Sequence, residues 1–420
     1  MQIEYNNEIK ERFVPIAYDE ILRGCVEYLV IKESLEYATL AKSLRLYYHH
    51  RFYKELQKLK ENYRPFNPDN DVIISPLSEE ELKRKEKALF AHVTPILNHA
   101  NYEILTKEAL HEIMNKTSPY GVKVSVDFDD FEEIQLYFRG ESFQKKTKRD
   151  PRKLYLKRIT YEEPLYRRLF LILKPKHIDA RAKEIAQAEG KKFDKVRKKL
   201  LKKNPLLFID ASNKSIYIKI FKNIPQVDLE TLFPNIKVKM ALFDKVKLGV
   251  FGGGGTIGGG STLIAKLSVA AIEPVSALMA LGAFGGILWR LIKEVFSRRA
   301  HYMARLAKNL YFHSLDNNEG ALNYMIELAT QEESKEALLA YVFLAQTPMT
   351  KEDLDEAIEL FVRETYKIEM DFEVEDGLKK LQSLGILNYH DEKYSVVSAQ
   401  SALELLDVHR LELMKETITA

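Results

Sequence analysis

The spacing of apolar residues predicts helices in the first part of the chain. From residue 13 to about residue 116, apolar side chains recur every three or four positions, which places them on one face of a helix. Helices are expected at residues 18–36 and 38–59, and the proline-containing stretch 63–69 breaks the pattern. Ser78 and Glu81 have the spacing of a capping box, and Thr106 is placed to start a further helix. We therefore expect an N-terminal helical region over residues 1–116.

After Gly121 the spacing changes to two, which predicts strands. We expect a mostly antiparallel sheet over residues 117–244, with a hairpin turn at 212–214 and a basic helical insertion at 178–204. The expected strand positions are Val122/Val124/Val126, Ile134/Leu136/Phe138, Leu154/Leu156/Ile159, Leu169/Leu171/Leu173, residues 206–209 and Ile216/Ile218/Ile220.

A long apolar stretch follows the predicted sheet. Residues 248–265 contain no charged side chain, Lys266 interrupts the run, and residues 275–289 are again uncharged. A helix needs about 20 mostly apolar residues to cross a hydrocarbon core of about 30 Å. Glu273 and Pro274 supply a polar break between two arms. The pattern predicts a transmembrane helical hairpin over residues 245–297, with a re-entrant or buried hairpin as the alternative.

Small residues in this stretch recur at a spacing of four, which is typical of closely packed membrane helices. The glycines occupy more than one side of the first arm, so a face remains for a second copy and we predict a homo-oligomer. A tryptophan and an arginine lie where the second arm would meet the membrane surface. The residues expected to define the hairpin are Gly254, Gly258, Lys266, Glu273, Pro274, Gly282, Gly286, Trp289 and Arg290.

The same glycines match nucleotide-binding patterns only in part. Gly253, Gly255 and Gly258 give G-x-G-x-x-G, but a dinucleotide site also needs a soluble helix, a second strand and an acidic residue about 20 positions on. A P-loop needs a lysine after its last glycine, and Gly260 is followed by Ser261. We expect no cofactor, and nucleotide binding remains an alternative.

Residues 298–420 have the order of elements found in a winged helix. Helices are expected at residues 298–312, 321–330, 334–346 and 374–384 and after Thr350, with wing strands at 386–389 and 394–397. In a DNA reader the third helix carries basic and amide side chains, but here it begins with Glu373, Glu375 and Asp376. We expect a protein partner at this acidic region rather than a nucleic acid.

Charge is unevenly distributed, although the net charge is only +3. Lysine and arginine dominate residues 141–203, and acidic residues dominate 316–376. Within the basic segment Lys195, Lys198, Lys199, Lys202 and Lys203 have helical spacing, which favours docking on anionic lipid headgroups. The alternative is an ordinary solvated helix face.

Two polar clusters are candidates for binding. Asp127, Asp129, Asp130, Glu132 and Glu133 offer oxygen ligands for a hard cation, but strand alternation would divide them between two faces, so we expect no metal. The second cluster is Asp316, Asn317 and Asn318, whose residue types are typical of a turn and which are kept as an alternative binding loop. The adjacent His49 and His50 would face different ways on a helix, and the single cysteine, Cys25, excludes an internal disulfide and is expected to be buried.

Several short motifs give the chain a resemblance to a known family. They are residues 11–15 (ERFVP), 100–103 (ANYE), 126–131, 137–140 (YFRG), 221–225 (FKNIP), 228–230 (DLE), 309–312 (NLYF), 315–318 (LDNN) and 335–341 (KEALLAY). The chain resembles the family of unknown function that includes mitochondrial transmembrane protein 143 and its bacterial and plant relatives. The resemblance implies a membrane protein with two closely spaced spans and no established reaction.

These observations lead to one functional expectation and one alternative. We expect an α+β membrane protein without catalytic residues, whose N-terminal helices, sheet and C-terminal winged-helix-like part lie on the cytoplasmic side of a lipid bilayer. The acidic N-terminus, with Glu4, Glu8 and Glu11, does not fit a mitochondrial import sequence, which favours a bacterial plasma membrane. The alternative is a membrane-bound enzyme, or a nucleotide- or metal-binding protein, that uses the acidic clusters or the glycine-rich stretch.

Overall fold

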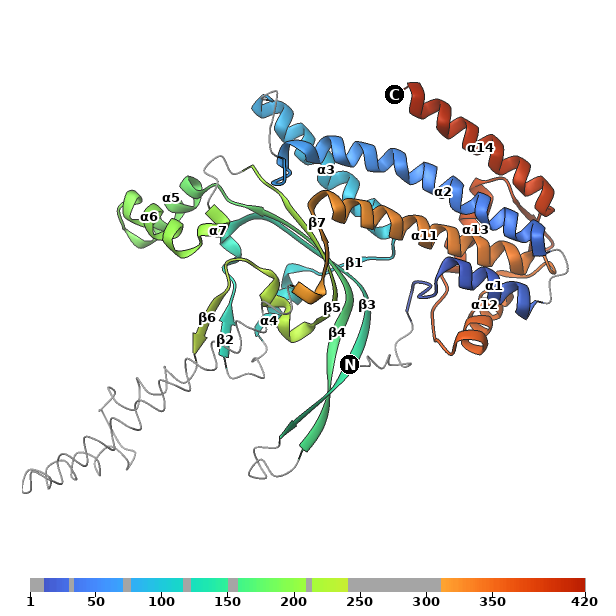
Figure 1. Cartoon of the computed structure of the whole chain (residues 1–420), viewed down its shortest axis with the longest axis horizontal. Helices are drawn as coiled ribbons and strands as arrows, with labels where there is room; N and C mark the ends of the chain where they lie inside the picture. The colour runs from blue at the N-terminus through green and yellow to red at the C-terminus, as the bar shows by residue number, and fades with distance from the viewer. Residues whose placement is uncertain are drawn as a thin grey trace, which may run out of the picture.

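A five-stranded antiparallel sheet forms the middle of the molecule (Figure 1). The computed structural model describes residues 11–29, 34–70, 77–115, 122–149, 158–208, 214–240 and 311–419. The strands lie in the order β1 (Glu103–Ile104), β3 (Phe131–Arg149), β4 (Arg158–Pro175), β5 (Tyr217–Pro225) and β7 (Ser314–Asn317). The predicted antiparallel sheet is therefore confirmed. The predicted strand near residue 122, β2 (Val122–Ser125), instead pairs with β6 (Lys237–Met240) in a separate two-stranded ribbon.

One face of the sheet is covered by three long helices, α2 (Ser34–Tyr63), α3 (Glu79–His99) and α11 (Asn318–Leu344). Tyr137, Phe170 and Ile218 point from the strands into the same apolar core as residues of these helices. The capping box that opens α3 is confirmed, since Ser78 accepts from the backbone N–H of Glu81 and Glu81 accepts from that of Ser78. The boundary between the first two helices was predicted wrongly, because α1 (Tyr18–Tyr28) ends before residue 36.

The other face of the sheet carries a second core under shorter helices. These are α4 (Lys107–Asn115), α5 (Ile178–Glu189), α6 (Phe193–Lys203), α7 (Pro205–Phe208) and the 3-10 helix η4 (Gln226–Leu232). Leu171 and Leu173 alternate with Phe170 and Ile172, so the middle of β4 is buried on both sides. Residues 206–209 were predicted as a strand, but α7 occupies residues 206–208, because a short apolar run fits a buried helical turn equally well.

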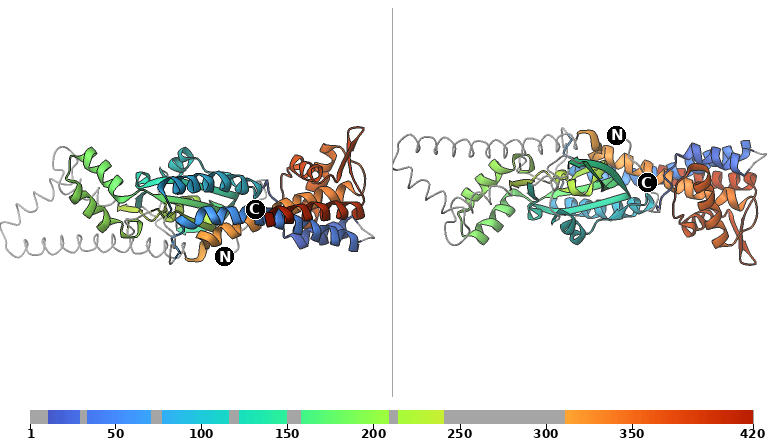
Figure 2. Two further views of the ribbon diagram at one scale, coloured as in Figure 1. Left: turned by 90° about the horizontal axis from the view of Figure 1, so that it is seen from above. Right: turned by 90° about the horizontal axis from the view of Figure 1, so that it is seen from below.

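The helices predicted after Thr350 and at residues 374–384 are present, and so is the predicted wing hairpin. α12 (Lys351–Tyr366) starts at the predicted cap, where the Thr350 hydroxyl accepts from the backbone of Asp353. After α13 (Val374–Ser383), the strands β8 (Leu387–His390) and β9 (Lys393–Val396) pair as an antiparallel hairpin, and α14 (Ala399–Thr419) follows. A bridge from Met349 to Tyr394 ties the hairpin to the start of α12. Figure 2 shows this group of helices at one end of an elongated molecule and α5 and α6 at the other.

Residues 321–344 form part of one helix, although two helices were predicted at 321–330 and 334–346. The polar stretch between residues 330 and 334 suggested a break, yet α11 runs through it without interruption. Glu332, Glu333 and Lys335 are almost fully buried there, and each has a side-chain partner of opposite charge. Tertiary ion pairs therefore replace the water that these side chains would otherwise require.

The expectation of a membrane protein must be corrected for the part of the chain that the structure describes. No helix within those residues is both long enough and apolar enough to cross a bilayer, because charged side chains recur through the long helices α2, α3 and α11. What the structure shows is an α+β fold built on an antiparallel sheet. The predicted hairpin at residues 245–297 and the predicted helix at 298–312 fall outside the described residues, apart from the last two positions of that helix.

Candidate functional site

A strongly basic surface is formed by α5 and α6. α5 ends at Gly190, whose positive φ of 63° lets the chain reverse into α6. The predicted single basic helix is thus two helices. Val196 and Leu200 on α6 are buried in the second core, which turns the opposite face of α6 outward. We call the exposed lysines of this pair the basic surface: Lys183, Lys191, Lys192, Lys195, Lys198, Lys199, Lys202 and Lys203.

The lysines singled out in the sequence share this surface. Lys195, Lys198, Lys199, Lys202 and Lys203 are all exposed. Within the described residues, Lys195, Lys198 and Lys202 have no ion-pair partner, so their charge faces the solvent. The arginine of α6 differs, since Arg197 Nε donates to the Asp179 carboxylate at 2.7 Å. The basic surface therefore presents lysine ammonium groups and no free guanidinium.

The acidic cluster after β2 is closed by an arginine. Arg181 Nε donates to Asp130 Oδ1 at 2.9 Å, and its Nη2 donates to Asp127 Oδ1 at 3.0 Å. Arg181 Nη1 donates to Glu184 Oε2 at 3.1 Å. The other oxygen of Asp130, Oδ2, accepts from Asn235 Nδ2 at 3.0 Å. The guanidinium occupies the place that a hard cation would take. No group of three or more metal-ligating side chains suited to a metal ion occurs in the described ranges.

From the sequence, the acidic residues between 127 and 133 were expected to lie on two faces of a strand. The pairing with Arg181 was not predicted. Asp127 and Asp130 come together because the 3-10 turn η2 (Phe128–Asp130) curls the chain between them, while Arg181 arrives from α5. Glu132 and Glu133 lie beyond the turn, and Glu132 pairs with Lys174 at 3.0 Å. Nothing in the spacing of the acidic residues points to an arginine about 50 positions later.

The predicted loop at residue 316 is a structural junction between β7 and α11. Asn318 has a positive φ of 48°, which asparagine tolerates better than most residues. Its Oδ1 accepts from the backbone of Ile218 at 3.2 Å, and its Nδ2 donates to Asp69 at 2.8 Å. Asp316 accepts from the backbone of Asn317. These bonds occupy the polar atoms of Asn318, which favours the turn over the binding loop.

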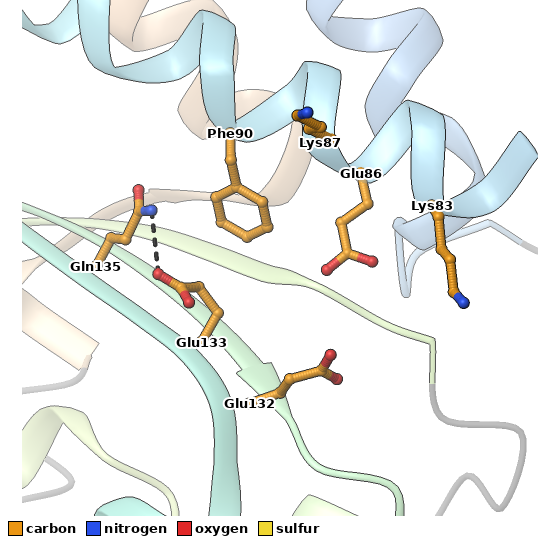
Figure 3. Close-up of a pocket in the computed structure, with 7 residues that line it drawn as sticks. All are labelled: Lys83, Glu86, Lys87, Phe90, Glu132, Glu133 and Gln135. Atoms are coloured by element: carbon orange, nitrogen blue, oxygen red, sulfur yellow. Dashed lines mark hydrogen bonds between the residues drawn. The ribbon is translucent and has the colours of Figure 1, made fainter. Parts of the chain in front are cut away.

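A cleft of about 440 Å³ lies between α3 and the start of β3. Figure 3 shows Glu86 and Phe90 reaching down from the helix toward Glu132, Glu133 and Gln135 on the strand. Two lysines, Lys83 and Lys87, complete the lining. A second cavity of about 280 Å³ shares Glu132 and lies on the α4 side of the same strand.

The charges inside the first cleft are partly neutralised by a buried lysine. Lys174 on β4 is 9% exposed and donates to Glu86 at 2.6 Å, and it also pairs with Glu132. Burial lowers the pKa of Lys174, but the two carboxylates outweigh burial and raise it above its usual value. Gln135 donates to Glu133 at 3.2 Å and accepts from Tyr137 at 3.0 Å. Glu86 and Glu132 are thus both paired with Lys174.

A buried cluster of ion pairs lies where α11 passes the sheet. Arg139 Nη2 donates to Glu332 Oε1 at 2.6 Å, and Lys335 bonds to the same carboxylate and to the backbone of Val14. One turn further on, Lys380 of α13 pairs with Glu333 at 3.1 Å and with Glu336. We call Arg139, Glu332, Glu333, Lys335, Glu336 and Lys380 the ionic cluster. Its members are almost fully buried, so it has the character of a junction between elements rather than an open site.

The residues predicted to define a membrane hairpin, from Gly254 to Arg290, lie outside the described residues. The glycine patterns considered for nucleotide binding and self-association belong to the same stretch. Cys25 is buried as expected. His49 is exposed and His50 half-buried, and their rings touch edge to face instead of converging on a common point.

Comparison with known proteins yields one family. Residues 131–320 match DUF3754, a family described as proteins of unknown function. No solved structure matches the chain. The matched range begins at the first residue of β3 and includes β4, β5, the basic surface and the first residues of α11. The resemblance to the transmembrane protein 143-like family stays a prediction.

Proposed function

We propose that this protein docks on the surface of anionic membranes through the basic surface of α5 and α6. The observation that carries the proposal is the arrangement of Lys195, Lys198 and Lys202 on one exposed helix face, without ion-pair partners among the described residues. Near an anionic leaflet each such lysine contributes about 1 kcal/mol. The cytoplasmic leaflet of a plasma membrane carries that charge, and it is the location we propose.

The shape of the surface supports docking without insertion. The apolar side of α6, with Val196 and Leu200, packs into the second core and is not free to enter lipid. The contact would therefore be electrostatic and would weaken as salt screens it. An electrostatic contact of this kind orients the molecule, because the acidic helix α12, with exposed Glu352, Asp353 and Glu356, lies at the opposite end (Figure 1).

Nucleic acid is a less suitable partner for the same surface. Readers of base edges use bidentate arginines, and binders of single strands add exposed aromatic side chains. The arginine of α6 is bound to Asp179, and Phe193 is only partly exposed against the core. Lysine ammonium groups act as point charges and suit a fluid headgroup layer.

The proposal can be tested with the full-length protein and vesicles. Binding to vesicles of phosphatidylcholine containing phosphatidylserine is compared with binding to phosphatidylcholine alone, at low and at high salt. We expect the variant K195Q/K198Q/K199Q/K202Q to bind the anionic vesicles at least tenfold more weakly, since four lysines contribute about 4 kcal/mol and tenfold is about 1.4 kcal/mol.

A matched control removes the same number of positive charges elsewhere. Lys42, Lys367, Lys379 and Lys393 are exposed and lie outside α5 and α6, and their replacement by glutamine should leave vesicle binding within a factor of three. Equal loss in both variants, or no preference of the native protein for anionic vesicles, would overturn the proposal. So would tighter binding to duplex DNA or RNA than to vesicles at the same salt concentration.

A further inference from the structure

The first residues of β3 form an open edge of the sheet. β3 pairs with β4 along its whole length, but on its other side β1 pairs only with Tyr137 and Phe138. One further bond runs from the Leu105 N–H to the Leu136 carbonyl. Between residues 131 and 135 no described segment pairs with this edge.

The backbone at Ile134 is directed toward that open side. In an antiparallel pair, every second residue exposes its N–H and C=O to the same edge. Leu136 uses this edge to accept from Leu105, so Ile134, two positions earlier, faces the same way. An unpaired edge of this kind is a template for another extended chain.

Two cavities flank the edge, one on each face of the sheet. Glu133 and Gln135 line the cleft under α3, whereas Ile134 lines the cavity beside α4. The α4 cavity is lined by the apolar side chains of Leu110, Phe128 and Phe131 and also by the polar side chains of Lys107, His111, Asp129 and Lys176. Because neighbouring side chains of a strand point to opposite faces, a chain added at this edge would place successive side chains in the two cavities.

Two lysines on the α3 side are available to such a chain. Glu86 and Glu132 are bonded to Lys174, and Glu133 accepts from Gln135. Lys83 and Lys87 line the same cleft, are exposed, and form no ion pair with a described residue. Lys83 and Lys87 therefore offer ion-pair partners to a carboxylate, while Leu110, Phe128 and Phe131 offer apolar contacts in the cavity beside α4.

We propose that the edge of β3 at residues 131–135 binds an extended acidic segment of a partner protein by strand addition. The segment would continue the line of β1, bond to the backbone at Ile134, place an apolar side chain against Leu110 and Phe131, and place an acidic side chain beside Lys83 and Lys87. Strand addition obtains affinity from main-chain hydrogen bonds and specificity from pockets for alternate side chains. This proposal is independent of the lipid contact, which uses α5 and α6.

The test uses the full-length protein and a fluorescein-labelled pentapeptide, Leu-Glu-Leu-Glu-Leu, measured by fluorescence polarisation. We expect it to bind at least tenfold more tightly than the same peptide with lysine in place of glutamate. The variant K83Q/K87Q should weaken the acidic peptide at least fivefold. Replacing the exposed Lys42 and Lys393, which line neither cavity, by glutamine should change its affinity less than twofold.

A backbone substitution separates strand addition from simple charge attraction. In I134P the outward N–H is removed, and proline is tolerated at an edge where that N–H faces away from the neighbouring strand. We expect I134P to weaken the acidic peptide at least tenfold, whereas I134V, which keeps the N–H, should stay within twofold of the native protein. A circular dichroism melt checks that both variants are folded, and a peptide with N-methylated amides provides the same test on the ligand if I134P is not. Equal affinity for both peptides, or no loss with the N-methylated peptide, would overturn the proposal.

Discussion

Arg139 on β3 and Glu332 on α11 are 193 positions apart in the sequence, yet they form a 2.6 Å ion pair with side chains only 6% and 1% exposed. Glu332 also accepts from the backbone N–H of Val14 at 3.1 Å. Burial by itself raises the pKa of Glu332, but Arg139 and Lys335 outweigh it, and the pKa lies below its usual value. One carboxylate thus joins the sheet, α11 and the N-terminal segment.

Removing the cation from this pair should destabilise the fold strongly. In R139M the Glu332 carboxylate keeps Lys335 but loses its partner on the sheet, and such a loss costs about 3–5 kcal/mol. The exposed pair between Arg45 and Glu327 also involves α11, with side chains 42% and 46% exposed, so R45M should change the free energy of unfolding by less than about 1 kcal/mol. Urea denaturation of both variants measures the difference. Similar losses would show that burial does not decide the strength of these pairs.

Glu336 should make stability depend on pH near neutrality. Burial raises its pKa from 4.5 to about 7. Between these values the folded protein keeps a proton that the unfolded chain has released, so the free energy of unfolding falls as the pH rises from about 5 to about 8. Burial likewise raises the pKa of Glu11 to about 7, which acts in the same direction.

The variant E336Q tests this assignment. Glutamine cannot titrate, so the melting temperature should fall less steeply between about pH 5 and about pH 8 than in the native protein. The control E319Q changes a half-exposed glutamate on the same helix and should leave the slope unchanged. If the melting temperatures of E336Q and of the native protein change with pH in parallel, a group other than Glu336 controls the pH dependence of stability.

Arg181 should be replaceable in part by a metal ion. R181A removes the guanidinium that Asp127, Asp130 and Glu184 share, and the mutual repulsion of these carboxylates should destabilise the protein by about 3 kcal/mol. Oxygen ligands arranged in this way suit Ca²⁺. We expect millimolar CaCl₂ to raise the melting temperature of R181A and to leave that of the native protein unchanged. A calcium effect of the same size on both proteins would contradict the expectation.

Asn318 should stabilise the fold through the hydrogen bonds of its side chain as well as through its backbone conformation. N318G tolerates the positive φ but loses the bonds to Ile218 and Asp69, for an expected loss of about 2 kcal/mol. N318A loses the same bonds and also strains the backbone, which adds about 1 kcal/mol. Chemical denaturation of the two variants separates these contributions. Equal stability would mean that the backbone conformation relaxes.

Local patterns in the sequence predicted the elements whose formation depends on nearby residues. Ser78 and Thr350 cap helices because their hydroxyls need only a backbone N–H three positions away. The alternation around Leu171 predicted a strand, and the wing hairpin appears at β8 and β9. The lysines of α6 were also found from spacing alone, because they follow the helical period.

Features that depend on residues distant in the chain were decided only by the tertiary structure. Residues 206–208 form a helical turn and α11 continues through a polar stretch, because burial and ion pairs outweigh local preference. Arg181 closed the acidic cluster from about 50 positions away, and the open edge of β3 exists because β1 is only two residues long. The sequence by itself determined the periods of the strands and helices and the charge of α6, since those follow from neighbouring residues. Which charges are neutralised, and which edge stays unpaired, followed only from how the elements pack.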